Sequence, residues 1–427
     1  MEVTIAQLAA QAYGASTALA QAPADIRNRA LHAQADALEQ QAEVIFAANR
    51  EDLTRSQAEG LAAPLLKRLK FDQAKLASVC DGLRQLAAMA DPLSHVQVAR
   101  ELDAGLTLRR VSCPIGVIGV IFESRPDALV QIGALCLKSG NAALLKGGAE
   151  ALHTNRVLFT VLHDAAMACG LPQGYAALLE TRQDVADMLA QDEHVSLIIP
   201  RGSNAFVRYI MDHTRIPVMG HADGICHVYV DRAADVDMAV AVVADAKTQY
   251  VAVCNAAETL LVHADIAEEF LPRLKAALDA AHTSIRGDGR TRAIIDCAEA
   301  TDEDWDTEYL DYILSIKIVD SLDEAIDHIN RHGSHHTDAI VTGDAAAAAR
   351  FQGRVDSAGV YWNVSTRFAD GYVYGLGAEV GISTGKLHAR GPVGLDGLIT
   401  YKYLLDGGGH IMADYAAGRK QFHHREL

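Results

Sequence analysis

The chain has 427 residues, of which half are hydrophobic and 22% are charged, so it is long enough for two or three globular domains. The net charge of −17 argues against a nucleic-acid partner, because such proteins present a basic face. No apolar run reaches the 18–20 residues or so that a membrane span requires.

The cysteines and the N-terminus predict a cytoplasmic protein. The seven cysteines are scattered, odd in number and free of CxxC or CxxH spacing, which excludes a disulfide framework and gives no zinc motif. The first residues, "MEVTIAQLAAQAYGAS", have no basic segment followed by an apolar core, so we expect no secretory signal. A reducing compartment fits these features.

Residues 1–95 are predicted to be helical. Within them Leu31, Leu38 and Ile45 repeat every seven residues in a stretch rich in Ala, Glu and Gln. This pattern is typical of an amphipathic packing helix and gives little indication of a functional site.

From about residue 111 buried strands alternate with helices. "IGVIGVIF", "AALLK" and "SLIIP" are strand-like runs, each followed by a helical stretch, and the first two of those helices end at Gly140 and Gly170. Such alternation predicts βαβ crossovers, a parallel sheet and ligands at the carboxyl ends of its strands.

A second α/β series begins near residue 226 and ends near 360. It includes "CHVYVD", "ETLLVH", "YILSIKIVD", "TDAIVTGD" and "AGVYWNV" as strands. The sequence therefore predicts two parallel-sheet α/β domains, 1–225 and 226–360, and a tail, 361–427, which is too small to fold alone. We expect the tail to return to the first domain and to pack on another subunit.

Two turns in the first domain suit a phosphate or a ribose. Lys146, Gly147 and Gly148 lie between a strand and a helix, where lysine and bare backbone N–H groups favour an anion. In "PRGSNAFVRYI", the residues Arg201, Gly202 and Ser203 repeat that geometry. Simpler interpretations are a solvated lysine and a Ser203 helix cap, and neither the GxGxxG nor the Walker pattern is present.

Further basic and polar residues follow other strands. Arg125, in "VIFESRPDA", lies just past a buried strand, where it serves either a local ion pair or a ligand. The glycine-rich loop after "YWNV" carries Ser365, Thr366 and Arg367 and is typical of a binding loop. The histidines of "NRHGSHHTD" have no carboxylate or cysteine in register, so we expect a polar turn and no metal site there.

The stretch "YVAVCNAAETLLVH" places Cys254 and the polar Asn255 between a helix and a buried strand. Buried cysteines are common and usually inert, so this position alone does not distinguish a core thiol from a nucleophile.

The motifs taken together resemble the aldehyde dehydrogenase superfamily. They are most similar to the branch that reduces L-glutamyl 5-phosphate in proline biosynthesis. The stretches that carry the resemblance are "VIFESRPDA", "GNAALLKGGAEA", "PRGSNAFVRYI", "IPVMGHADGICHVYVD", "VCNAAETLLVH", "WDTEYLDYILSIKIVDSLDEAIDHIN", "HTDAIVTGD" and "GLGAEVGISTGKLHARGPVGLDGLITYKY".

The resemblance implies a role for each motif. Cys254 is the expected nucleophile, with Asn255 beside it as a catalytic residue. The cofactor NADP(H) is expected on Lys146, Gly147, Gly148, Arg201, Gly202, Ser203 and, at the nicotinamide ribose, Glu308. The substrate is expected on Arg125, His221, Ser365, Thr366 and Arg367. The implied partners are L-glutamyl 5-phosphate, phosphate, the glutamate 5-kinase that supplies the substrate, and further copies of the chain.

The sequence departs from the wider superfamily in two places. Hydrolytic members carry a water-activating glutamate before the cysteine, and the corresponding stretch here, "MGHADGICH", has none. Their Pro-Trp-Asn segment, which supplies an oxyanion donor, corresponds here to "FESRPD". We therefore expect the backbone N–H of Cys254 and one side chain to hold the oxyanion, and a thioester on Cys254 that phosphate rather than water cleaves.

Three alternatives stay open at this point. One is an aldehyde dehydrogenase that acylates coenzyme A, and another is a catalytically silent member that serves as a scaffold. The third is a thiol hydrolase that uses Cys254 with a distant histidine, although it leaves both phosphate-type turns unexplained.

Overall fold

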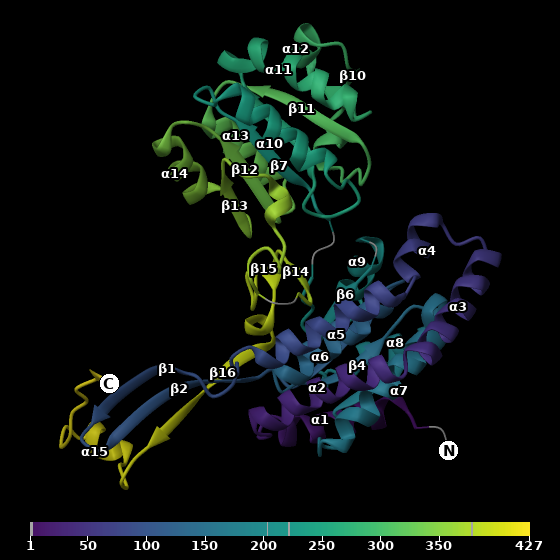
Figure 1. Ribbon diagram of the computed structural model, residues 1–427. Helices are drawn as coiled ribbons and strands as arrows, with labels where there is room; N and C mark the ends of the chain where they lie inside the picture. The colour runs from purple at the N-terminus through teal and green to yellow at the C-terminus, as the bar shows by residue number, and fades with distance from the viewer. Residues whose placement is uncertain (1–2, 203, 221–222, 377–378) are drawn as a thin grey trace.

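The computed structural model describes residues 3–202, 204–220, 223–376 and 379–427. Helices fill the N-terminal segment, as predicted, and they pack beside the first parallel sheet (Figure 1). They are α1 (Ile5–Leu19), α2 (Ala24–Gln40), α3 (Ala42–Ala58), α4 (Ala63–Leu69) and α5 (Gln73–Ala88). Among the described residues, no helix combines the length and the apolar character needed to cross a membrane.

The first sheet has four parallel strands in the order β5-β4-β3-β6. They are β3 (Val117–Phe122), β4 (Ala142–Lys146), β5 (Ala176–Leu179) and β6 (Leu197–Arg201), and the helices that follow them are α6 (Pro126–Lys138), α7 (Leu152–Ala168), α8 (Arg182–Leu189) and α9 (Asn204–Asp212). A short 3-10 turn, η1 (Ala149–Ala151), precedes α7. β3 and β4 are buried along their whole length, which explains their unbroken apolar sequences.

The second sheet has seven strands in the order β10-β9-β11-β8-β7-β12-β13, and every pairing in it is parallel. The strands are β7 (Cys226–Val230), β8 (Ala257–His263), β9 (Ser284–Gly287), β10 (Ala298–Glu299), β11 (Ile313–Val319), β12 (Thr337–Val341) and β13 (Gly359–Trp362). Its helices are α10 (Val236–Thr248), α11 (Ala264–Ala280), α12 (Gly289–Ile294), α13 (Leu322–His332) and α14 (Ala345–Arg354), with the 3-10 turn η2 (Asp302–Asp306) before β11.

A third, antiparallel sheet projects away from both α/β bodies (Figure 1). Its order is β16-β2-β1-β17, and its strands are β1 (Val96–Asp103), β2 (Leu106–Pro114), β16 (Ile399–Asp406) and β17 (Arg425–Glu426), with α15 (Met412–Ala416) beside them. The tail thus pairs with residues 96–114, which the sequence had assigned to the first α/β domain. That assignment is wrong for these two strands, because β2 pairs with β16 along eight residues.

The tail reaches this sheet through the region where the two α/β bodies meet. It includes the 3-10 turn η3 (Thr366–Phe368), the hairpin of β14 (Gly381–Ser383) and β15 (Gly391–Val393), and the 3-10 turn η4 (Leu395–Leu398). The hairpin lies between the upper body and the first sheet in Figure 1.

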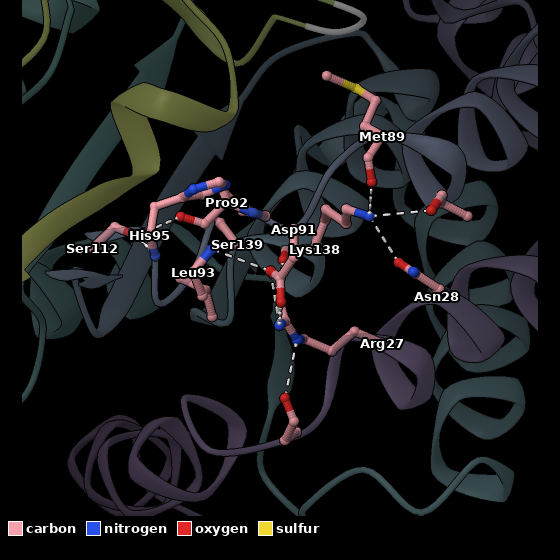
Figure 2. A network of polar contacts seen from close by, with 12 residues as sticks. Arg27, Asn28, Met89, Asp91, Pro92, Leu93, His95, Ser112, Lys138 and Ser139 are labelled. Carbon is pink, nitrogen blue, oxygen red and sulfur yellow. Dashed lines mark hydrogen bonds and ion pairs between the residues drawn. The ribbon is translucent and has the colours of Figure 1, made fainter. Parts of the chain in front are cut away.

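A buried polar network joins the N-terminal helices to α6 and to the entry of the projecting sheet (Figure 2). Arg27 donates to both carboxylate oxygens of Asp91, at 3.0 and 2.9 Å, and to the backbone carbonyl of Lys138. The Lys138 ammonium in turn donates to Asn28 and to the carbonyls of Ala87 and Met89 at the end of α5. Because these donors are satisfied internally, two buried cations are tolerated here.

Candidate active site

Three sequence-predicted site residues lie at one edge of the first sheet. Lys146 ends β4, Arg125 follows β3 and Arg201 ends β6, and these strands are neighbours in the order β4-β3-β6. The carboxyl ends of parallel strands meet at the same edge, so the topology brings these cations together as the sequence pattern predicts. The acidic chain therefore concentrates basic groups where an anionic ligand would bind.

The turn after β4 is held by residues of the N-terminal helix α3. Asp52 on α3 accepts hydrogen bonds from the backbone N–H and hydroxyl of Thr154, both at 2.8 Å, and so caps the start of α7. Arg55 donates to the carbonyls of Ala149 and Glu150, at 2.8 and 3.1 Å. The sequence pattern indicates no functional role for this helix. The signal that could have indicated one is that the polar residues Asn49, Asp52 and Ser56 continue its buried face at helical spacing.

Glu150 folds back over this turn. Its carboxylate accepts from the backbone N–H and the hydroxyl of Ser124, at 2.5 and 2.9 Å. A Cβ at Gly148 would overlap the Glu150 carboxylate and one at Gly147 would overlap the Asn155 amide, so a side chain at either position would displace these groups. Burial lowers the pKa of Lys146, and nearby Glu150 opposes that effect.

Arg125 and Arg201 are electrostatic neighbours. The backbone N–H of Glu123 donates to the Arg201 carbonyl at 3.0 Å, which ties the end of β3 to the end of β6. The pKa of Arg125 is lowered, first by loss of hydration and second by repulsion from Arg201, and the Tyr250 phenol is also close to it. Arg201 itself lies 3.5 Å from the partly buried carboxylate of Glu379.

Cys254 lies in the loop between α10 and β8 and is half-buried. The Cys226 thiol donates to its backbone carbonyl at 3.2 Å, and a side chain at Gly224 would overlap its backbone. Residues 224–226 therefore pack against the backbone of Cys254 and hold this loop in place.

Asn255 contacts the loop that was predicted to bind ligand. Its side-chain amide donates to the carbonyl of Ala369 at 2.9 Å, and the Thr366 hydroxyl donates to its backbone carbonyl at 2.7 Å. Ser365 caps η3, and Arg367 donates to Gln249 at 3.0 Å. The predicted residues of this loop therefore lie beside the loop of Cys254, and several of their polar groups hold that loop in place.

Glu308 lies where the second body faces the start of α9. Its carboxylate accepts a hydrogen bond from the side-chain amide of Asn204, which also donates to Asp223 at 3.0 Å. Asp223 is further held by Arg208, at 2.5 Å. Asn204 and Asp223 were not predicted as site residues, whereas the predicted residues Ser203 and His221 lie outside the described part of the chain.

The histidine-rich segment forms a turn with internal partners. His332 contacts Asp306 at 2.8 Å, and His335 contacts the carbonyl of Asp356 at 2.5 Å. Among the residues that the structure describes, no group of three or more His, Cys, Asp or Glu is placed to hold a metal ion.

The fold and these motifs are matched by known proteins. The aldehyde dehydrogenase family model matches residues 2–300. The chain is 60% identical over 421 residues to a gamma-glutamyl phosphate reductase of Pelotomaculum thermopropionicum, covering 99% of this chain and 97% of that one. It is 57% identical to the protein of the same name from Acetivibrio thermocellus, covering 100% and 99%.

Solved structures agree. The crystal structure of gamma-glutamyl phosphate reductase from Thermotoga maritima has a TM-score of 0.93 and 38% identity, covering 95% of this chain and 99% of that one. An acetylating aldehyde dehydrogenase from Geobacillus thermoglucosidasius, with a TM-score of 0.65 and 16% identity over 95% and 97%, shows the shared fold alone.

The chain belongs to the aldehyde dehydrogenase family, a family of oxidoreductases that use a nicotinamide cofactor. Within it, the chain is a member of the gamma-glutamyl phosphate reductases. The resemblance and the fold class predicted from the sequence are thereby confirmed.

Proposed function

We propose that this enzyme reduces L-glutamyl 5-phosphate to L-glutamate 5-semialdehyde in proline biosynthesis, with NADPH as the reductant and release of phosphate. The observation that carries the proposal is the half-buried Cys254, whose loop is held by residues 224–226 and contains Tyr250, an electrostatic neighbour of Arg125. The names of relatives that match nearly the whole chain support the substrate.

The residues at the strand edge fit a dinucleotide. A Cβ at Gly202 would lie 2.7 Å from the Glu123 carboxylate and 2.9 Å from the Phe206 ring, so a side chain there would have to displace both groups. Lys146 and Glu308 would hold the two riboses, and Gly202 with the start of α9 the pyrophosphate. When bound, the cofactor supplies the hydride that reduces the acyl group.

The chain's own chemistry then centres on Cys254. Its thiolate attacks the acyl carbon, the carbon–oxygen bond to phosphate breaks, and a thioester forms. Hydride addition to the thioester carbon would give a tetrahedral oxyanion on Cys254; as it collapses, the carbon–sulfur bond breaks, the aldehyde leaves and the thiolate is restored. Cysteine suits both steps because it is a strong nucleophile and a good leaving group.

We assign Asn255 a different role from the catalytic one expected from the sequence. Its amide donates to the Ala369 carbonyl and is buried, so it positions the nucleophile loop. The developing oxyanion would then be held by the Cys254 backbone N–H and a second side chain.

Water activation is disfavoured by the surroundings of the cysteine. Asp223 is the only carboxylate in residues 219–227, and both its oxygens are engaged, by Asn204 at 3.0 Å and Arg208 at 2.5 Å on α9. A carboxylate held in this way on the cofactor side is a poor base for water next to Cys254.

We also propose that copies of the chain associate through the projecting sheet and that the enzyme works in the cytoplasm, fed by glutamate 5-kinase. Tyr401, Tyr403 and Leu405 on β16 are each about half exposed, at 49, 58 and 57%. A row of large apolar side chains on an exposed strand is typical of a surface covered in an assembly.

The replacement Cys254→Ser tests the proposed function. An alkoxide is far harder to form than a thiolate near pH 7, so we expect turnover to fall by at least about a thousandfold while NADPH binding is retained. The assay follows NADPH consumption with L-glutamyl 5-phosphate generated in situ, with Cys297→Ser as the matched control. Activity of Cys254→Ser within tenfold of the parent would refute the assignment.

A further inference from the structure

A fully buried ion pair closes the loop that carries Cys254. Lys247, near the end of α10, and Glu258, near the start of β8, are both 0% exposed, and their charged atoms lie 2.5 Å apart. A buried pair of this kind contributes little net stability compared with well-packed apolar residues, so its presence calls for another explanation.

Glu258 also holds the loop of Glu308. While one carboxylate oxygen contacts Lys247, the other accepts the backbone N–H of Leu310 at 3.3 Å. Leu310 has a φ of +53°, a left-handed conformation that a leucine adopts only when its surroundings hold it there.

Tyr309, which lies between Glu308 and Leu310 in the chain, is anchored as well. The Lys247 ammonium lies 5.9 Å from the centre of the Tyr309 ring, and Arg286 lies 5.2 Å from it on another approach. The Tyr309 hydroxyl donates to Asp304 at 2.7 Å. Both residues that follow Glu308 are therefore fixed, and the buried pair contacts each of them.

We propose that Lys247 and Glu258 are positioning residues, which set the Glu308 loop in register with the Cys254 loop and so couple occupation of the cofactor site to the exposure of the thiol. This rests on the proposed function, in which Glu308 meets the cofactor and Cys254 the substrate. Neither Lys247 nor Glu258 touches a ligand in this account; they act through the backbone of Leu310 and through the two ends of the nucleophile loop.

Two double variants separate this role from simple stability. Lys247→Met/Glu258→Gln removes both charges and keeps an acceptor for Leu310. Lys247→Met/Glu258→Leu is matched in size and neutrality and has no acceptor. The control Arg273→Met/Asp237→Asn removes an exposed ion pair between α11 and α10 in the same body.

Three measurements are made on each protein: the thermal midpoint, the NADPH dissociation constant by fluorescence, and the alkylation rate of Cys254 by iodoacetamide with and without saturating NADP⁺. The reduction of L-glutamyl 5-phosphate by the parent enzyme is measured first. Loss of this activity would refute the proposed function, separately from the inference about Lys247 and Glu258. In the parent, we expect NADP⁺ to change the alkylation rate at least fivefold.

We expect the control to keep this ratio within twofold of the parent. Lys247→Met/Glu258→Gln should lower the ratio to an intermediate value, because it loses the ion pair that closes the Cys254 loop but keeps an acceptor for Leu310. Lys247→Met/Glu258→Leu should fold, bring the ratio to about one and weaken NADPH binding by about tenfold. A parent ratio of one, or equal ratios in the two double variants, would overturn the inference. Should the leucine variant fail to fold, Glu258→Asp, which draws the carboxylate away from Leu310, must show the same loss or the inference fails.

Discussion

The position of Arg125 is set by the two elements on either side of it. It follows a fully buried strand and precedes Pro126, which begins α6, so it lies at the carboxyl edge of the sheet. There it is close to Tyr250, four residues before the nucleophile, and is repelled by Arg201. An anion placed between the two arginines would relieve this repulsion.

We therefore expect Arg125→Ala to raise the KM for L-glutamyl 5-phosphate by about ten- to a hundredfold, because loss of a charged hydrogen bond costs about 1.5–3 kcal/mol. The dissociation constant of NADPH should change little. Steady-state kinetics and a separate cofactor titration measure the two effects, with Arg29→Ala, an exposed position on α2, as the control for general loss of positive charge. An unchanged KM would return Arg125 to a structural role.

The cofactor preference also depends on single side chains. The resemblance to the aldehyde dehydrogenases implies that members preferring NAD carry a glutamate three residues after the lysine, and Ala149 occupies that position here. Glu150, one step later, is taken up by Ser124 instead of facing outward, although it stays an electrostatic neighbour of Lys146. The second cation near Lys146 is Arg182, whereas Arg201 faces Glu379.

These contacts lead us to expect that kcat/KM is at least tenfold higher for NADPH than for NADH. Replacing Ala149 with Glu should reverse much of the preference, since it would set a carboxylate against the 2′-phosphate. Equal kcat/KM values for the two cofactors in the parent enzyme would remove this argument.

At the scale of elements, protonation of His328 on helix α13 affects the free energy of unfolding. His328 is buried against the rings of His227 and Trp305, each 5.6 Å away. Burial first, and then the charge of His227, lower the pKa of His328 to about 2. In the unfolded chain the same imidazole takes up a proton near pH 6.5.

Because the unfolded state binds the proton more readily, this contribution to stability is complete above about pH 6.5 and falls as the pH is lowered toward 2. The loss amounts to at most about 1.4 kcal/mol per pH unit, or about 2 kcal/mol at pH 5. His328→Phe should therefore show a smaller drop in thermal midpoint between pH 7.5 and pH 5 than the parent, whereas the exposed His32→Gln should not. An identical drop in the parent and in His328→Phe would contradict this account.

The sequence was informative wherever one element determines the site. Lys146 and Arg125 follow buried apolar runs whose strand character is local, so their shared edge could be predicted from βαβ alternation. Cys254 depended on the resemblance, since a cysteine between a helix and a strand is usually inert. The pairing of β2 with β16 joins segments nearly 300 residues apart, and antiparallel pairing of this kind leaves no local pattern that identifies the partner strand.

The same limit applies to long-range polar contacts. Asp52, which caps α7 from α3, and Asp223, which meets α9, are ordinary acidic residues in sequence and acquire a role only through packing. Lys247 and Glu258 frame the nucleophile loop within twelve residues, yet only the structure shows that both are buried and that Glu258 reaches Leu310.

At the scale of the whole molecule, the central claim is that a thioester on Cys254 is cleaved by phosphate and protected from water. It depends on both bodies, because Asp223, the one carboxylate in the stretch before β7, is held by α9 of the first body. Run in reverse, glutamate 5-semialdehyde and NADP⁺ should load the cysteine without phosphate but should not release it.

The most direct measurement is therefore rapid-mixing detection of NADPH formed from glutamate 5-semialdehyde and NADP⁺ in phosphate-free buffer. We predict a burst of at most about one NADPH per active site followed by a stall, and steady turnover when phosphate or arsenate is added. Sustained NADPH formation without either anion would contradict the account, because it would mean that a group in the enzyme activates water against the thioester.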